Sequence, residues 1–193
     1  MKKQDKKDAG TIFNPVMYLM VLILTVQLLL LFVEYKRVAW VSGVVTDTMT
    51  DALLGACTLD QEELYHYGMT NELTILHPES KYEMFKEILL EELGLSSDMQ
   101  VTERSPALLE DKVIIKDFRI YSVEEENIIF YDVRESGSYT RTILEDARGV
   151  YSIENGKVIE ETTLAAQIGF TVKFFGEPIE VSKYHMVDVT NGG

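Results

Sequence analysis

An uncharged stretch of 22 residues near the start of the chain, residues 12–33, constrains the fold more than any other feature. As an α-helix rising about 1.5 Å per residue it would be about 33 Å long, which matches a bilayer core of roughly 30 Å. Asn14 and Pro15 stand in its first turn, where a missing backbone donor costs little. A stretch so long and so rich in leucine exceeds what a small soluble core needs. The sequence therefore predicts a membrane-spanning helix rather than a buried core helix.

The charges on either side of this stretch indicate its orientation. Residues 1–10 contain four lysines, whereas only Lys36 and Arg37 closely follow the stretch. Because the more basic flank remains in the cytoplasm, we expect a cytoplasmic tail (residues 1–10) and a head outside the cell membrane. A cleaved secretory signal is the alternative, but its apolar region would be shorter and a cleavage site would follow closely.

Composition excludes some partners and some chemistry. The net charge is −14, and the acidic residues lie almost wholly after Asp47, so no basic face is available for nucleic acid. Membrane lipid is the partner that the apolar stretch predicts. The only cysteine, Cys57, cannot form an internal disulfide or a zinc site with adequate partners. It lies too far past residue 33 for a lipid-attachment cysteine, so we interpret it as a small residue on a packed helix face.

Beyond residue 33 the pattern becomes amphipathic rather than uniformly apolar. Apolar residues recur at intervals of three or four, which keeps one stripe on a helix. This pattern predicts one helix from about Thr11 to about Leu64, within a unit of residues 11–66 whose first part spans the membrane and whose second part lies under the head. The stripe consists of Tyr35, Val38, Val41, Val45, Met49, Ala52 and Ala56.

The head, residues 67–193, is predicted to be α+β, with one or two helices packed on an antiparallel sheet. Ser80 and Glu83 have capping-box spacing, which predicts a helix through Leu93, with Gly94 ending it. From residue 113 the apolar period becomes two. Asn155-Gly156 predicts a tight hairpin turn. The predicted strands are residues 113–121, 128–133, 150–153, 157–159, 164–174 and 179–189.

No constellation of residues in the sequence predicts catalysis. His66, His77 and His185 are scattered without metal-ligand spacing, and the acidic runs are most simply solvated faces and turns. Phosphate-binding loops, nucleophile elbows and calcium loops are absent as motifs. We therefore expect a non-catalytic protein with no cofactor and no bound metal.

The layout resembles that of a known family of envelope proteins. A basic leader with a glycine, an apolar helix prolonged as an amphipathic helix, and a β-rich head form the general plan of type IV pilins and pseudopilins. The stretches 33–37 (VEYKR) and 51–56 (DALLGA) look more specifically like those of the TadE/TadG-like minor pseudopilins of tight-adherence (Tad) pilus systems. That resemblance implies a non-catalytic minor component of a bacterial pilus or secretion assembly, with other membrane proteins of that assembly as partners.

Three pairs of residues are candidate sites under this resemblance. Pilin-like precursors are cut after a glycine, so Gly10–Thr11 is a candidate cleavage point, although no glutamate follows it before Glu34. Glu34 and Tyr35 are candidate subunit contacts; the alternative is a residue at the level of the lipid headgroups beside an ordinary interfacial anchor.

Gly55 and Ala56 are further candidate subunit contacts. Their small side chains would allow helices of two subunits to approach closely, and the alternative is packing beneath the chain's own head.

A membrane-tethered binding module, unrelated to pili, is the alternative function. It would need a concave, aromatic-lined patch on the head. The candidate residues for such a patch are Tyr121, Phe130, Tyr131, Tyr139 and Tyr151, although aromatic residues in strands usually belong to the core.

Overall fold

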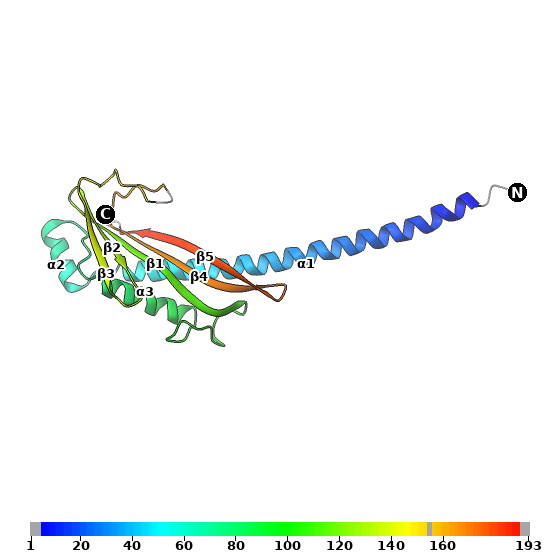
Figure 1. Cartoon of the computed structure of the whole chain (residues 1–193), viewed down its shortest axis with the longest axis horizontal. Coiled ribbons are helices and arrows are strands. Elements are labelled where there is room, and N and C mark those ends of the chain that lie inside the picture. Colours follow the sequence, from blue (N-terminus) through cyan, green and yellow to red (C-terminus); the bar gives the residue numbers. More distant parts are fainter. Residues whose placement is uncertain (1–4, 154–155, 190–193) are drawn as a thin grey trace.

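The computed structural model describes residues 5–153 and 156–189, with the backbone path alone for residues 5–14. The fold is α+β, as the sequence predicts: a long N-terminal helix, two further helices and a five-stranded antiparallel sheet (Figure 1). The elements are α1 (Asp5–Ala56), α2 (Gln61–Thr70), α3 (Pro78–Glu92), β1 (Leu109–Glu124), β2 (Asn127–Val133), β3 (Tyr139–Leu144), β4 (Thr163–Phe174) and β5 (Glu177–Asp188).

Helix α1 runs without interruption for 52 residues, from the apolar stretch into the head. The predicted continuation to Leu64 is wrong, because α1 ends at Ala56 and a separate helix, α2, begins at Gln61. Asp60 starts the new helix as its N-cap residue: its side chain accepts hydrogen bonds from the backbone N–H groups of Glu62 and Glu63. The backbone N–H of Asp60 donates a hydrogen bond to the Glu63 side chain in turn, which completes a capping box.

Helix α3 begins at Pro78, two residues before the predicted capping box at Ser80. His77 is the N-cap residue and makes no side-chain capping bond. The prediction of a Ser80–Glu83 box is therefore wrong; Pro78 starts the helix instead, since its fixed φ suits the first helical position. The predicted end of the helix is confirmed, with Gly94 at φ +61° directly after the C-cap residue Leu93.

The sheet has the strand order β3-β2-β1-β4-β5, and every neighbouring pair is antiparallel. Strands β1 and β2 form a hairpin with Glu124 opposite Asn127, and β4 and β5 form another that turns at Gly176. The predicted strands 113–121, 128–133, 164–174 and 179–189 are thereby confirmed to within a few residues. Strand β3 was not predicted. Its sequence, YTRTIL, lies on the sheet edge and is mostly exposed, so it lacks the alternation of a half-buried strand.

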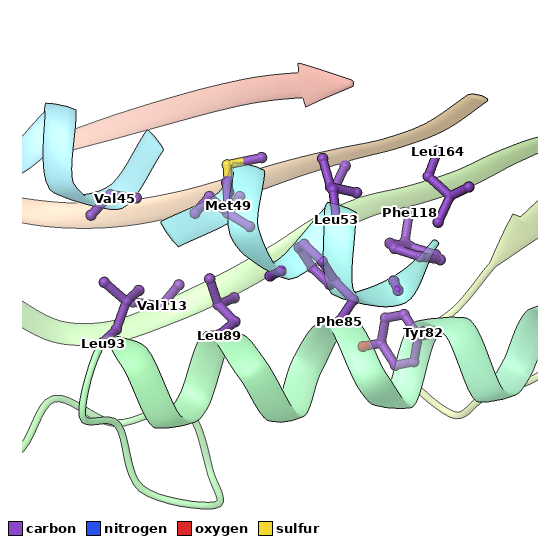
Figure 2. Packing of buried hydrophobic residues seen from close by; sticks show 14 of the residues in the cluster. Val45, Met49, Leu53, Tyr82, Phe85, Leu89, Leu93, Val113, Phe118 and Leu164 are labelled. Atoms are coloured by element: carbon purple, nitrogen blue, oxygen red, sulfur yellow. The ribbon is translucent and has the colours of Figure 1, made fainter. Parts of the chain in front are cut away.

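The main core lies between one face of the sheet and the helices α1 and α3 (Figure 2). The predicted apolar stripe of α1 supplies its upper layer from Val41 onward, whereas Val38 is half-buried and Tyr35 is exposed. Burying side chains of this size contributes roughly 1.5–3 kcal/mol each. The residues that Figure 2 labels in this core are Val45, Met49, Leu53, Tyr82, Phe85, Leu89, Leu93, Val113, Phe118 and Leu164.

The connection from β3 to β4 covers part of the other face of the sheet, the face that points away from the main core. Ile153 and Ile159 from this connection pack with Tyr121, Ile128 and Ala165 in a second apolar cluster. The predicted segments 150–153 and 157–159 pair antiparallel, as the hairpin predicted at Asn155-Gly156 requires, but through one isolated bridge, Ser152 with Val158, rather than as strands of the sheet. Asn155 lies outside the described residues. The apolar residues of the two segments serve this cover rather than the sheet.

Candidate functional site

The exposed half of α1 is the most conspicuous surface of the molecule. Every residue from Pro15 to Val33 is exposed, and most of the large apolar side chains there are more than half accessible. An apolar surface of this length is far larger than the few hundred Å² that a soluble monomer normally presents. This part of α1 is long and apolar enough to cross a membrane.

Polar and aromatic side chains of α1 follow this apolar surface directly, between residues 34 and 40. Arg37 donates a hydrogen bond to Glu34, with 2.8 Å between Nη1 and Oε1, so the acid that was a candidate for contacting another subunit has a partner in its own helix. Tyr35 and Trp40 are 60% and 62% exposed. Amphipathic aromatic and basic residues in this position are typical of a membrane–water interface.

The small residues at the end of α1 face the chain's own head. Ala56 is fully buried in the main core. A Cβ placed on Gly55 would lie 2.2 Å from the Cδ1 atom of Ile88 in α3, which shows how closely the two helices approach. Helix α3 of the same chain thus occupies this face, the alternative that the sequence analysis left open.

The candidate cleavage point, Gly10–Thr11, lies in the first turns of α1. Only the backbone is described there. The structure places both residues on a continuous helical path that leads into the apolar stretch.

A buried ion pair joins α2 to α3, and sequence reasoning missed it. Lys81 Nζ lies 2.5 Å from Glu63 Oε2, and the two side chains are 4% and 0% exposed. Lys81 also donates to the carbonyl of Thr58, while Glu63 accepts from the N–H of Leu76. Charged residues are seldom fully buried unless paired, so the sequence alone favoured exposure. The capping-box spacing of Asp60 and Glu63 was the sequence signal that could have predicted a helix start here and so drawn attention to Glu63.

Cys57 lies close to this pair and is not a reactive thiol. Burial raises its pKa to about 11, an effect opposed by the nearby charge of Lys81. The thiolate is the nucleophilic form, so this sulfur is largely inert near neutral pH.

His77 sits on the surface beside Asp60 and Glu62, and its pKa is raised, chiefly by the hydrogen bond with Glu62. Within residues 15–153 and 156–189, whose side chains are described, no three acidic, histidine or cysteine side chains gather as a metal site would require.

The aromatic residues proposed for a ligand-binding patch do not form one. Tyr121 and Tyr131 are buried, at 1% and 6% exposure, and they belong to the two different apolar clusters. Tyr121 stacks with Phe130 and Tyr151, whereas Tyr131 contacts Tyr139 edge-on. These rings mainly build the two cores.

A cleft of about 560 Å³ opens elsewhere, where β1 extends past the end of β2. Tyr82 lies at its inner wall; burial raises the pKa of this phenol, so it remains a neutral donor. Its buried hydroxyl makes no hydrogen bond with any described part of the chain. The charged residues that line the cleft are balanced in sign: Lys116, Arg119, Arg134, Asp117, Asp132 and Glu135.

Comparisons with protein-family models, with curated proteins and with solved structures found no significant match to this chain.

Proposed function

We propose that this protein is a non-catalytic, single-pass membrane protein that acts as a structural subunit of an envelope assembly, with its N-terminus in the cytoplasm and its head outside. One observation carries the proposal: a single helix supplies both the exposed apolar span and the core of the head. Residues 15–33 are exposed, and the same helix is fully buried at Val41, Val45 and Met49.

The continuity of α1 favours an assembly subunit over a simple tether. Val41 follows Val33 by eight residues, about 12 Å of helix, so the head begins directly above the bilayer. A tether needs only a flexible linker, whereas a continuous helix fixes the head relative to the span. Such a rod can transmit contacts between packed helices in the membrane to an ordered array of heads.

The resemblance to TadE/TadG-like minor pseudopilins supports the same conclusion. In that layout the exposed half of the helix packs against other subunits within or above the membrane. Glu34 and Tyr35 would lie at the lipid edge of those contacts. The partners would then be other membrane proteins of a pilus or secretion assembly.

The experiment is crosslinking of the full chain in its native membranes. We expect capture of sibling copies or of other assembly proteins, and loss of this capture when Leu30 is replaced by Asp, because a charge within the uncharged apolar span is costly. Leu30→Ala is the matched control and should retain capture. Capture that is absent from the unmodified protein, or unchanged in Leu30→Asp, contradicts the proposal.

A ligand-binding head is the second candidate, and the cleft beside Tyr82 favours it. A buried hydroxyl without a partner costs roughly 1–3 kcal/mol, and a bound acceptor would remove that cost. The balanced charges of the cleft suit a small zwitterionic molecule.

Thermal unfolding of the full chain with a panel of amino acids, short peptides and amino sugars tests this second function. A compound that stabilises the natural protein but not Tyr82→Phe would support it. Absence of stabilisation across the panel would count against it.

A further inference from the structure

We propose that the β4–β5 hairpin forms a second contact with the membrane, with Phe175 placed in the lipid headgroup layer. The inference deepens the proposed function and rests on the membrane anchoring of α1. Figure 1 shows this hairpin extending alongside α1 toward its exposed N-terminal half. The partner of this surface is the lipid bilayer itself.

The length of β4 brings its tip to the membrane boundary. Leu164 lies beside the last turns of α1, close to Leu53 (Figure 2), and Phe174 follows it by ten residues. At about 3.3 Å per residue the strand advances roughly 33 Å, which a helix covers in about 22 residues. Counting 22 residues back from the last turn of α1, Leu53 to Ala56, reaches Leu31 to Glu34, at the outer end of the exposed span.

The exposure of α1 independently indicates that the membrane boundary lies near Glu34. All residues from Pro15 to Val33 are exposed, and Glu34 is the first that is partly covered. Its side chain is 19% exposed, and Val38, one turn later, packs against the main core. Protein cover of the helix therefore begins where the apolar span ends, as a head resting on the bilayer surface requires.

The chemistry of the turn suits lipid rather than water. Phe175 is 53% exposed and its ring contacts Phe174 edge-on, with 4.9 Å between centroids. Phe175 and Gly176 both have positive φ, +52° and +84°. Two-residue hairpins with this backbone strongly prefer Asn-Gly, and a bulky residue with positive φ is a genuine outlier. A strained, exposed phenylalanine is explained by a contact made outside the chain.

Neighbouring charges limit the depth of the contact. Glu177 follows the turn directly, and a carboxylate does not enter the hydrocarbon core without large cost. Lys36 and Arg37 of α1 lie near the same level by the count above and oppose that charge. The hairpin therefore reaches the headgroups, with the Phe175 ring at the upper ends of the acyl chains.

Single-tryptophan fluorescence of the full chain tests this placement. Trp40 is the only native tryptophan, so Trp40→Phe gives a silent background. Phe175→Trp reports the hairpin, Leu28→Trp reports the anchor, and Val150→Trp, at a distal position that is 75% exposed, is the aqueous control. The proteins are reconstituted into phosphatidylcholine vesicles that contain a minority of phosphatidylglycerol, with lipids brominated near the top of the acyl chains.

We expect the fluorescence of Phe175→Trp to be quenched by the brominated lipid and shielded from aqueous acrylamide, whereas Val150→Trp behaves oppositely. If Leu28→Trp is quenched by lipid but Phe175→Trp is not, the hairpin contact is refuted while the anchor stands. If Leu28→Trp is also unquenched, the anchor itself fails.

Phe174→Trp, directly before the turn and in ring contact with Phe175, replaces Phe175→Trp if that variant does not fold. Lipid quenching of this second reporter supports the contact, and acrylamide quenching equal to that of Val150→Trp overturns it.

Discussion

Replacing Lys81 by methionine should destabilise the head strongly, because it leaves the Glu63 carboxylate buried without its cationic partner. The two side chains are 4% and 0% exposed and 2.5 Å apart. Removing one partner of such a pair typically costs about 3–5 kcal/mol. The backbone N–H of Leu76 would remain bound to Glu63 Oε1, which keeps the cost from rising further.

Thermal unfolding of the full chain in detergent micelles, followed by circular dichroism, measures this cost. For a head of this size the loss corresponds to a fall of roughly 10–15 °C in Tm. Lys157→Met is the matched control, since the Lys157–Asp188 pair is about one-third exposed on both sides and such pairs contribute about 1 kcal/mol or less.

The charge of Glu63 carries this argument, so its removal should reverse much of the effect. The double variant Lys81→Met/Glu63→Gln should recover part of the lost stability, because an amide is cheaper to bury than a carboxylate. A Lys81→Met loss no larger than that of Lys157→Met would refute the reasoning.

Three further predictions concern the head. Gly94→Ala should lower the free energy of unfolding, measured by chemical denaturation, by about 1–3 kcal/mol, because φ is +61° and the new Cβ would lie 2.8 Å from the Cβ of Arg104. Gly68→Ala, in helix α2 with open space around it, is the control and should raise that free energy by up to about 1 kcal/mol. Cys57, with its pKa raised to about 11, should react slowly with a disulfide reagent at pH 8 and rapidly once the head is unfolded; equal rates would contradict its burial. The pKa of His77 is raised in the folded state, so folding is favoured when this histidine is protonated. This contribution to stability is full below the unfolded pKa of about 6.5 and is lost as the pH rises through the folded pKa. An NMR titration that places the pKa of His77 at or below 6.5 would contradict the contact with Glu62.

The sequence predicted the elements whose signals are local and periodic. The apolar run and the stripe from Val41 to Ala56 specify α1, and strict alternation specifies β4. The end of α1 was missed because Cys57, Thr58 and Leu59 contain no glycine or proline. The Asp60 cap that separates the two helices depends on side-chain bonds, which an apolar pattern does not report.

Features set by tertiary contacts could not be predicted. Ile153 and Ile159 resemble strand residues, but they cover the second sheet face from an irregular segment. The Lys81–Glu63 pair joins residues 18 positions apart, and each alone looks like a solvated surface residue. The cleft beside Tyr82 arises only because β1 is longer than β2.

Spin-label accessibility along α1 in bilayers tests the central claim most directly. Each residue from Pro15 to Trp40 is replaced in turn by a labelled cysteine in a Cys57→Ser background, and collisions with dissolved oxygen and with a water-soluble nickel complex are compared. We predict that residues 15–33 are accessible to oxygen and inaccessible to nickel, with the crossover at Glu34. Nickel access along residues 15–33 would contradict a lipid-embedded span, whereas oxygen access that is lowered every 3.6 residues without nickel access would mark the face that packs against another subunit.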